Sequence, residues 1–304
     1  MWPVTARIAL ATASEFPELD EDGPVLVGAL ASRGARAEPA VWTDPDVDWS
    51  AYDLVVIRST WDYAPRRDEF VAWAHRVAAV TRLANPAPVI EWNTDKTYLR
   101  ALAAAGLPVV PTDWLAPGDT FAPPVHGEYV VKPAVSAGSK DTNRYRAGEH
   151  DQVAATHAGA LLAAGRTVMV QPYLHEVDAA GETAVLFLGG TYSHAIRKGP
   201  LLTAGMEPVA GPYKEEVIQP REPSAREREV AEAVLDALAD VAPAPRSALP
   251  YARVDLVPGL DGEPTLLELE LTEPSMFLGD DGARGERAAG RFADAITQMT
   301  SRHG

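Results

Sequence analysis

The side chains most capable of chemistry are one lysine at the end of an apolar run and three carboxylates much later in the chain. Lys132 is followed closely by a loop of small residues at 136–139. Asp255, Glu268 and Glu270 lie in two runs with a strand-like pattern. A lysine and flexible backbone N–H groups suit a polyphosphate, and carboxylates at strand ends suit the Mg²⁺ that accompanies it. Together these residues predict a nucleotide-dependent enzyme.

For Lys132, the simplest alternative is an edge-strand lysine that points to water. A charge that ends an apolar strand is costly unless it reaches a partner, and the adjoining loop favours a phosphate as that partner. The loop does not match the G-x-x-x-x-G-K-[ST] pattern, which argues against a Walker-type NTPase.

Glu268 and Glu270 are two residues apart on a predicted strand, so their side chains share one face. Neighbouring carboxylates repel each other, and a cation is the usual remedy. A solvated polar face is the alternative, but the surrounding leucines make both faces of this run largely apolar. The pattern therefore favours a metal site.

Composition excludes several classes of protein. The 304-residue chain has a formal net charge of −16, which argues against a nucleic-acid or anionic-membrane surface. It contains no cysteine, so disulfides, thiolate zinc sites and a cysteine nucleophile are excluded. No run approaches the roughly 18 apolar residues of a membrane span, and we expect a cytoplasmic protein without nucleic-acid or membrane partners.

Strand and helix patterns alternate in the first part of the chain and predict a parallel, doubly wound sheet. The predicted strands are 7–13, 37–42 and 53–57, and the predicted helices are 22–33 and 67–79. No G-x-G-x-x-G follows the first strand, so a dinucleotide site is not expected there.

The rest of the chain predicts further mixed structure. The expected helices are 93–106, with Asn93 as its cap, then 151–164, 224–240 and 284–299. The expected strands are 128–133, 143–147, 167–171, the hairpin 183–188 and 192–198, and 251–257 and 264–271. Residues 200–216 are expected to form a mobile loop.

The segment Arg58-Ser59-Thr60-Trp61-Asp62-Tyr63 follows a predicted strand, and open α/β sheets bind ligands at the carboxyl ends of strands. Arg58 suits a substrate carboxylate and Asp62 a substrate ammonium. A structural loop in which Trp61 packs is an equal alternative, and the same two alternatives apply to Glu273 and Ser275. For His175 and His194 a structural role is favoured over acid–base catalysis.

The order of these motifs resembles that of the ATP-grasp carboxylate ligases over residues 90–300. The motifs are Lys96, Val-Val-Lys132-Pro, Gln171-Pro-Tyr173-Leu174, Gly-Glu182, Arg197-Lys198, Arg253-Val-Asp255 and Glu268-x-Glu270. More narrowly, the segments 58–63, 92–99 and 268–277 resemble the O-ureido-D-serine cyclo-ligase (D-cycloserine synthetase) group. The resemblance implies an α/β (α+β) ATP-grasp fold with an N-terminal doubly wound pre-ATP-grasp domain.

Roles for individual residues also follow from the resemblance. It implies that Lys96 and Lys132 bind ATP phosphates beneath a closing loop that contains Ser136, Gly138 and Ser139. It implies that Gln171, Tyr173 and Leu174 hold adenine, that Glu176 or Asp178 holds ribose, and that Asp255, Glu268 and Glu270 bind Mg²⁺. Arg197, with Lys132, would be catalytic, and Arg58, Ser59, Thr60, Asp62, Tyr63, Glu273 and Ser275 would contact the substrate. Glu270 replaces the Asn that most ATP-grasp ligases carry.

The expected reaction converts a small amino-acid-like carboxylate into an acyl phosphate, which an internal nitrogen then attacks to close a ring. An intermolecular ligase that joins an amino acid or peptide to a separate amine stays open, and a regulatory module without turnover is disfavoured by the intact Lys, Asp and Glu set. The expected domains are 1–90 (pre-ATP-grasp), 91–175 (central, with its lead-in helix) and 176–304 (C-terminal, with the Mg²⁺ site). Family analogy suggests a homodimer.

Overall fold

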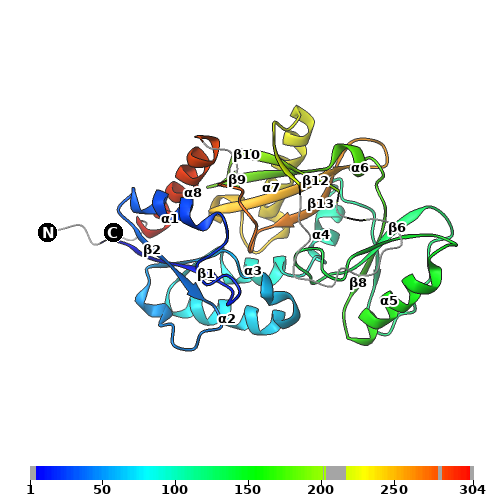
Figure 1. The fold of residues 1–304 in the computed structure, drawn as a ribbon, viewed down its shortest axis with the longest axis horizontal. Coiled ribbons are helices and arrows are strands. Elements are labelled where there is room, and N and C mark those ends of the chain that lie inside the picture. The colour runs from blue at the N-terminus through cyan, green and yellow to red at the C-terminus, as the bar shows by residue number, and fades with distance from the viewer. Residues whose placement is uncertain (1–4, 201, 203–216, 280–282, 302–304) are drawn as a thin grey trace.

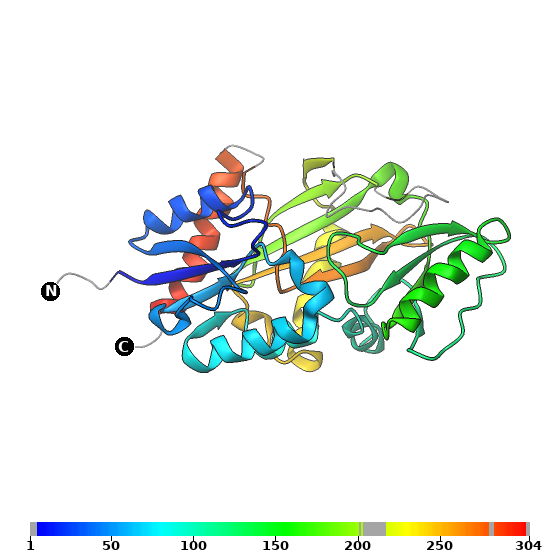
Figure 2. The same cartoon turned by 60° about the horizontal axis from the view of Figure 1, so that its bottom comes forward.

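The computed structural model describes residues 5–200, 202, 217–279 and 283–301, which form three sheets (Figure 1). The first sheet is parallel, with strand order β2-β1-β3-β4, and the other two are antiparallel. Figure 2 shows the first sheet at one end of the molecule and the middle sheet, with its helix, at the other. The mixed α/β architecture agrees with the fold class expected from the sequence.

The N-terminal sheet is covered by helices on both faces, which confirms the doubly wound prediction. Its strands are β1 (Arg7–Thr12), β2 (Arg36–Val41), β3 (Leu54–Ile57) and β4 (Arg82–Ala84). Alternate residues of β1 and β3 point to opposite faces, because the side-chain period of a strand is two. One set packs against α1 (Gly23–Ala31) and α8 (Ala283–Ser301), and the other packs against α2 (Arg67–Val80).

The middle sheet has the order β5-β8-β6-β7 and one helix on its outer face. Its elements are β5 (Asp113–Leu115), β6 (Glu128–Pro133), β7 (Asn143–Arg146), α5 (Asp151–Ala163) and β8 (Val168–Pro172). The aromatic and aliphatic side chains on one face of β6 and β8 pack on α5. The opposite face carries Lys132 and Gln171 toward the centre of the molecule.

The C-terminal sheet has the order β11-β10-β9-β12-β13. Its strands are β9 (Glu182–Leu188), β10 (Thr191–Lys198), β11 (Ile218–Arg221), β12 (Tyr251–Pro258) and β13 (Pro264–Glu270). On β12, Val254 and Leu256 face α7 (Ala225–Val241), so the alternate residues Arg253 and Asp255 face the opposite side.

The single helix expected over residues 93–106 is wrong. Two short helices, α3 (Ala87–Asn93) and α4 (Tyr98–Ala104), are separated by a break that contains Lys96. Asn93 ends α3 rather than capping a helix, because its side chain donates to the Leu269 carbonyl at 2.8 Å and accepts from the Leu271 N–H at 2.7 Å. The break lets the Lys96 N–H donate to the Ala134 carbonyl at 3.0 Å.

The remaining short helices are α6 (Val177–Ala180) and the 3₁₀ turns Trp49–Ala51, Trp61–Arg66 and Arg246–Ala248. Most of the segment 200–216, expected to be a mobile loop, lies outside the described residues. None of the helices in the described part of the chain is long and apolar enough to cross a bilayer.

Candidate functional site

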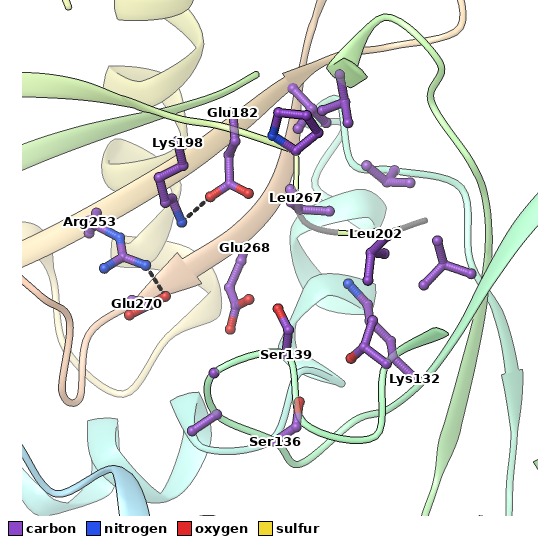
Figure 3. Close-up of a pocket in the computed structure, with 18 of the residues that line it drawn as sticks. Lys132, Ser136, Ser139, Glu182, Lys198, Leu202, Arg253, Leu267, Glu268 and Glu270 are labelled. Carbon is purple, nitrogen blue, oxygen red and sulfur yellow. Dashed lines mark hydrogen bonds and ion pairs between the residues drawn. The ribbon is translucent and has the colours of Figure 1, made fainter. Parts of the chain in front are cut away.

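A cavity of about 530 Å³ lies between the middle and C-terminal sheets, and its size is typical of a small-molecule site. Figure 3 shows residues of both sheets that line it. Many of the residues singled out from the sequence meet in its wall. They are Lys96, Lys132, Ser136, Gly138, Ser139, Gln171, Tyr173, Leu174, Glu268, Glu270, Glu273 and Ser275.

Two lysines approach the cavity from different elements. Lys132, on β6, is 8% exposed, and its ammonium forms no hydrogen bond or ion pair with any other described residue. Burial, together with the nearby charge of Lys96, lowers the pKa of Lys132 to about 8, although Glu268 and Glu182 act against this shift. Lys96 donates to the Ser136 carbonyl and pairs with Glu268, each at 2.9 Å. Among the residues that the structure describes, Lys132 is therefore a buried cation without an ion-pair partner, and an anionic ligand would supply one.

The small-residue loop after β6 turns through left-handed backbone conformations. Gly138 has a φ of 60° and Ser139 a φ of 57°, and both residues line the cavity. In Figure 3, Ser136 and Ser139 lie on this loop, and the Glu268 side chain extends toward them from β13. A loop of this composition exposes backbone N–H groups and hydroxyls next to two lysines.

The segment after β8 forms another part of the wall. Gln171 donates through its amide to the Thr112 hydroxyl at 2.8 Å. The Tyr173 hydroxyl donates to the Asp178 carboxylate, and the guanidinium of Arg144 lies 3.4 Å from the centre of the Tyr173 ring. Glu176 and Asp178 are both exposed and lie outside the cavity wall. The carboxylate that does line this region is Glu182.

The register of the C-terminal sheet brings opposite charges together. Lys198 is directly opposite Glu182, and Arg253 is directly opposite Glu270, and each pair forms an ion pair (Figure 3). Asp255 is 1% exposed and pairs with Lys198 and Arg253, at 2.8 Å each. Burial alone would raise the pKa of Asp255, but these two cations outweigh burial and lower it. The negative charge of Asp255 is thus already neutralised by two protein cations.

The three predicted metal ligands are consequently placed differently. Glu268 and Glu270 line the cavity, whereas Asp255 does not. Within the described ranges, no set of three His, Asp or Glu side chains lies close enough together to hold a metal ion. Burial raises the pKa of Glu270 to about 7, although Arg253 acts against this shift. Two hard oxygen donors facing the cavity fit Mg²⁺ that is shared with phosphate oxygens, which usually needs only one or two carboxylates.

The segment 58–63, expected to contact substrate, is mostly enclosed. Arg58, Ser59 and Thr60 are at most 2% exposed. Asp62 accepts from the Trp42 indole at 2.7 Å and pairs with Arg66 at 2.6 Å, and neither Asp62 nor Tyr63 is in the cavity wall. Trp61 is the residue of this segment that lines the cavity, so its side chain does more than the packing considered from the sequence.

Burial raises the pKa of Glu273 to about 8, and the Tyr63 hydroxyl is a hydrogen-bonding partner of Glu273.

Arg197, expected to be catalytic, does not line the cavity. Its guanidinium donates to the carbonyls of Ala180 and Ala179 at 2.5 and 2.7 Å. The next residue, Lys198, faces the cavity because successive residues of β10 point to opposite sides. Lys198, Glu182, Arg253, Trp61 and Glu21 are wall residues that were not selected as site residues from the sequence. The alternation of side chains along a strand could have found two of them. Lys198 must point to the side opposite Arg197, and Arg253 must share a face with Asp255.

Comparisons with known proteins show which sequences and structures the chain resembles. Residues 8–85 match the family model for the D-cycloserine synthetase DcsG, N-terminal domain. The chain is 41% identical to the cycloserine biosynthesis protein DcsG of Streptomyces lavendulae, over 96% of this chain and 98% of that protein. It superimposes on the crystal structure of D-cycloserine synthetase DcsG with a TM-score of 0.85 and 40% identity, covering 97% of this chain and 100% of that one.

A more distant solved structure shares the fold. The D-alanine–D-alanine ligase of Bacillus anthracis, solved in complex with ATP, matches with a TM-score of 0.63 and 13% identity, covering 97% of each chain.

Proposed function

We propose, because the chain belongs to the D-cycloserine synthetase family of ATP-grasp ligases, that it uses ATP to cyclise an O-ureido-D-serine-type amino acid to D-cycloserine. The observation that carries the proposal is the convergence of four cations, Lys96, Lys132, Lys198 and Arg253, on one cavity. Five carboxylates line the same cavity, among them the candidate Mg²⁺ ligands Glu268 and Glu270. Such a set suits ATP and a substrate carboxylate at the same time.

The chemistry needs an activated carboxyl group, because a carboxylate is a poor electrophile. Transfer of the γ-phosphoryl group gives an acyl phosphate and ADP, and the nitrogen bonded to oxygen then attacks the acyl carbon as phosphate leaves. The ring retains the carbamoyl group, whose hydrolysis consumes one water and releases carbamic acid. Since the nucleophile and the electrophile belong to one molecule, holding them close makes ring closure effectively unimolecular.

Roles for the cavity residues follow from their positions. Lys96, Lys132 and the loop that contains Ser136, Gly138 and Ser139 would bind the ATP phosphates, with charge stabilisation as the main catalytic contribution. Gln171, Tyr173 and Leu174 would contact the adenine. Glu182 replaces Glu176 and Asp178 as the candidate for the ribose, since only Glu182 lines the cavity.

Glu268 and Glu270 would hold Mg²⁺, which supplies further neutralisation of phosphate charge when it is bound. Asp255 would act indirectly, by fixing Lys198 and Arg253 in place. Those two cations replace Arg197 as candidates to stabilise the acyl phosphate. The end of the cavity formed by Trp61, Glu273 and Ser275 would receive the amino acid.

We also propose three structural units, 1–90, 91–175 and 176–304, each built around one of the three sheets. Two helices make contacts outside their own unit. Helix α8 packs between the N-terminal sheet and its own C-terminal sheet, and α4 packs against α7 of the C-terminal unit.

The experiment that tests the function is ADP release against a small substrate panel. The panel contains O-ureido-D-serine, its L-isomer, and single amino acids with and without a separate amine. Turnover on O-ureido-D-serine alone, lost in Lys132→Ala, supports the proposal. Turnover that requires a second amine replaces it with an intermolecular ligase.

A further inference from the structure

After β13 the chain runs along the cavity as an irregular segment, residues 273–278, here called the cavity loop. Its side chains alternate between two environments. Those that line the cavity are Glu273, Ser275 and Phe277, and those buried on the opposite side are Pro274, Met276 and Leu278. The conformation of this loop therefore decides which groups face the substrate end of the cavity.

The loop is anchored by a buried ion pair from the N-terminal unit. Both carboxylate oxygens of Asp22 accept backbone N–H groups from the loop, Met276 at 2.8 Å and Leu278 at 2.5 Å. Arg58 donates to the Pro274 carbonyl at 3.1 Å and lies 3.8 Å from the Asp22 carboxylate. Asp22 is 6% exposed and Arg58 is 2% exposed, so these interactions are shielded from water.

Three more side chains each bind another carbonyl of the loop. The Trp61 indole donates to Glu273 at 2.9 Å, Arg253 donates to Ser275 at 3.2 Å, and His194 donates through Nε2 to Met276 at 2.9 Å. Side chains from other segments thus donate the hydrogen bonds to the loop backbone that a neighbouring strand would donate in a sheet.

Asp22 makes these bonds at the expense of its local role. It stands at the N-cap of α1, where an aspartate usually accepts N–H groups of the first helical turn. Its side chain makes no such bond to α1. Asp22 does not cap its own helix, and both of its carboxylate oxygens bind a segment more than 250 positions later. Such a departure from local preference is expected where a residue contributes to a functional site.

We propose that Asp22 is a positioning residue: through its two bonds to the Met276 and Leu278 amides it fixes the cavity loop, and so sets how tightly the amino-acid substrate is held. The inference rests on the proposed function for the identity of that substrate. In this proposal Arg58 helps to hold the cavity loop from its buried side, whereas the sequence led us to expect that Arg58 contacts the substrate.

The test is Asp22→Asn, because an amide keeps one acceptor and turns an N–H donor toward the second backbone N–H. We expect KM for O-ureido-D-serine to rise about tenfold, as the loss of one charge-assisted hydrogen bond implies. KM for ATP is expected to change by less than about twofold, since the phosphate-side residues do not contact Asp22. Equal rises in both constants, or an unchanged KM for the amino acid in a folded variant, would overturn the proposal.

Asp20→Asn is the matched control. Asp20 carries the same charge and also lies close to Arg58, but no hydrogen bond joins its carboxylate to the described residues of the cavity loop. We expect this variant to keep both KM values near those of the wild type. A rise in KM for the amino acid equal to that of Asp22→Asn would mean that charge alone matters, and would contradict positioning by hydrogen bonds.

Amide hydrogen exchange provides a readout that does not depend on the substrate. In Asp22→Asn, protection is expected to fall at Met276 and Leu278 and to persist in α1 and α8. Unchanged protection at both amides, or a loss spread through α1 and α8, would overturn the positioning role. A wild-type protein that turns over no substrate of the panel would refute the proposed function, while the exchange result would still decide whether Asp22 holds the loop.

A second variant covers the case in which Asp22→Asn does not fold. Trp61→Phe removes the indole donor to the Glu273 carbonyl and keeps an aromatic ring. It is expected to raise KM for the amino acid more than KM for ATP, and equal changes would count against a positioned loop.

Discussion

The ammonium of Lys96 lies 2.9 Å from the Glu268 carboxylate, and the same ammonium donates to the Ser136 carbonyl at 2.9 Å. One side chain, placed in the break between α3 and α4, therefore joins the small-residue loop of the middle sheet to the carboxylate strand of the C-terminal sheet. Burial opposes the charge, but Glu268 outweighs it and raises the pKa of Lys96. The pair ties together the two sides of the cavity between which the nucleotide is proposed to bind.

The state of Lys132 should make ATP binding depend on pH. Burial lowers the pKa of Lys132 to about 8, so the ligand-free protein loses this positive charge as the pH rises through that value. Because the protonated form attracts phosphate, KM for ATP is expected to rise above about pH 8. Steady-state kinetics between pH 6.5 and 9.5, a range spanning about 1.5 units to either side, would measure the change.

Two substitutions separate Lys132 from other groups. Lys132→Arg keeps its charge throughout this range and should remove the inflection. Lys140→Arg alters an exposed lysine in the loop that follows β6, and this variant should keep the inflection. An inflection that survives in Lys132→Arg would assign the pH dependence to another residue.

Glu268 should control the requirement for Mg²⁺. Glu268→Gln removes a negative oxygen that lines the cavity and leaves Lys96 without its carboxylate partner. We expect the concentration of Mg²⁺ at half-maximal ADP release to rise by about tenfold or more. The matched variant Glu263→Gln, which alters an exposed carboxylate just before β13, should titrate as the wild type does. Identical Mg²⁺ titrations of all three proteins would rule out Glu268 as a ligand.

Lys198 and Arg197 offer a test of orientation on one strand. Lys198→Met removes a cavity cation and leaves Glu182 without its partner, whereas Arg197→Met alters a side chain that points away from the cavity. We expect kcat to fall about 100-fold or more in Lys198→Met and less than about tenfold in Arg197→Met. ADP release should be measured well below the melting transition of each variant. The reverse order would restore Arg197 as the catalytic cation.

Period-two and helical patterns were sufficient to predict most of the fold. The strands β1, β2 and β3, the hairpin of β9 and β10, and the long helices α2, α5 and α7 follow directly from them. The break between α3 and α4 could not be predicted, because the Asn93 side chain forms its bonds with the end of β13 and the residue after it, 176 and 178 positions later. Short strands such as β4 and β5 carry too few residues for a pattern to be seen.

The candidate site was only partly predictable for a related reason. Sequence motifs identify side chains suited to phosphate and metal, and Lys132, Glu268 and Glu270 do line the cavity. The sequence does not reveal which charges neutralise one another, and Asp255 proves to be enclosed between Lys198 and Arg253. It also does not reveal that Arg58 is buried behind a loop that follows it by more than 200 positions.

The most direct test of the account is the product formed from ATP, Mg²⁺ and O-ureido-D-serine when no other amine is present. We expect mass spectrometry to detect D-cycloserine, with one ADP released for each ring closed, and we expect Lys132→Ala to form neither. ADP release that appears only when a separate amine is added, with an open-chain amide as the product, would contradict this expectation.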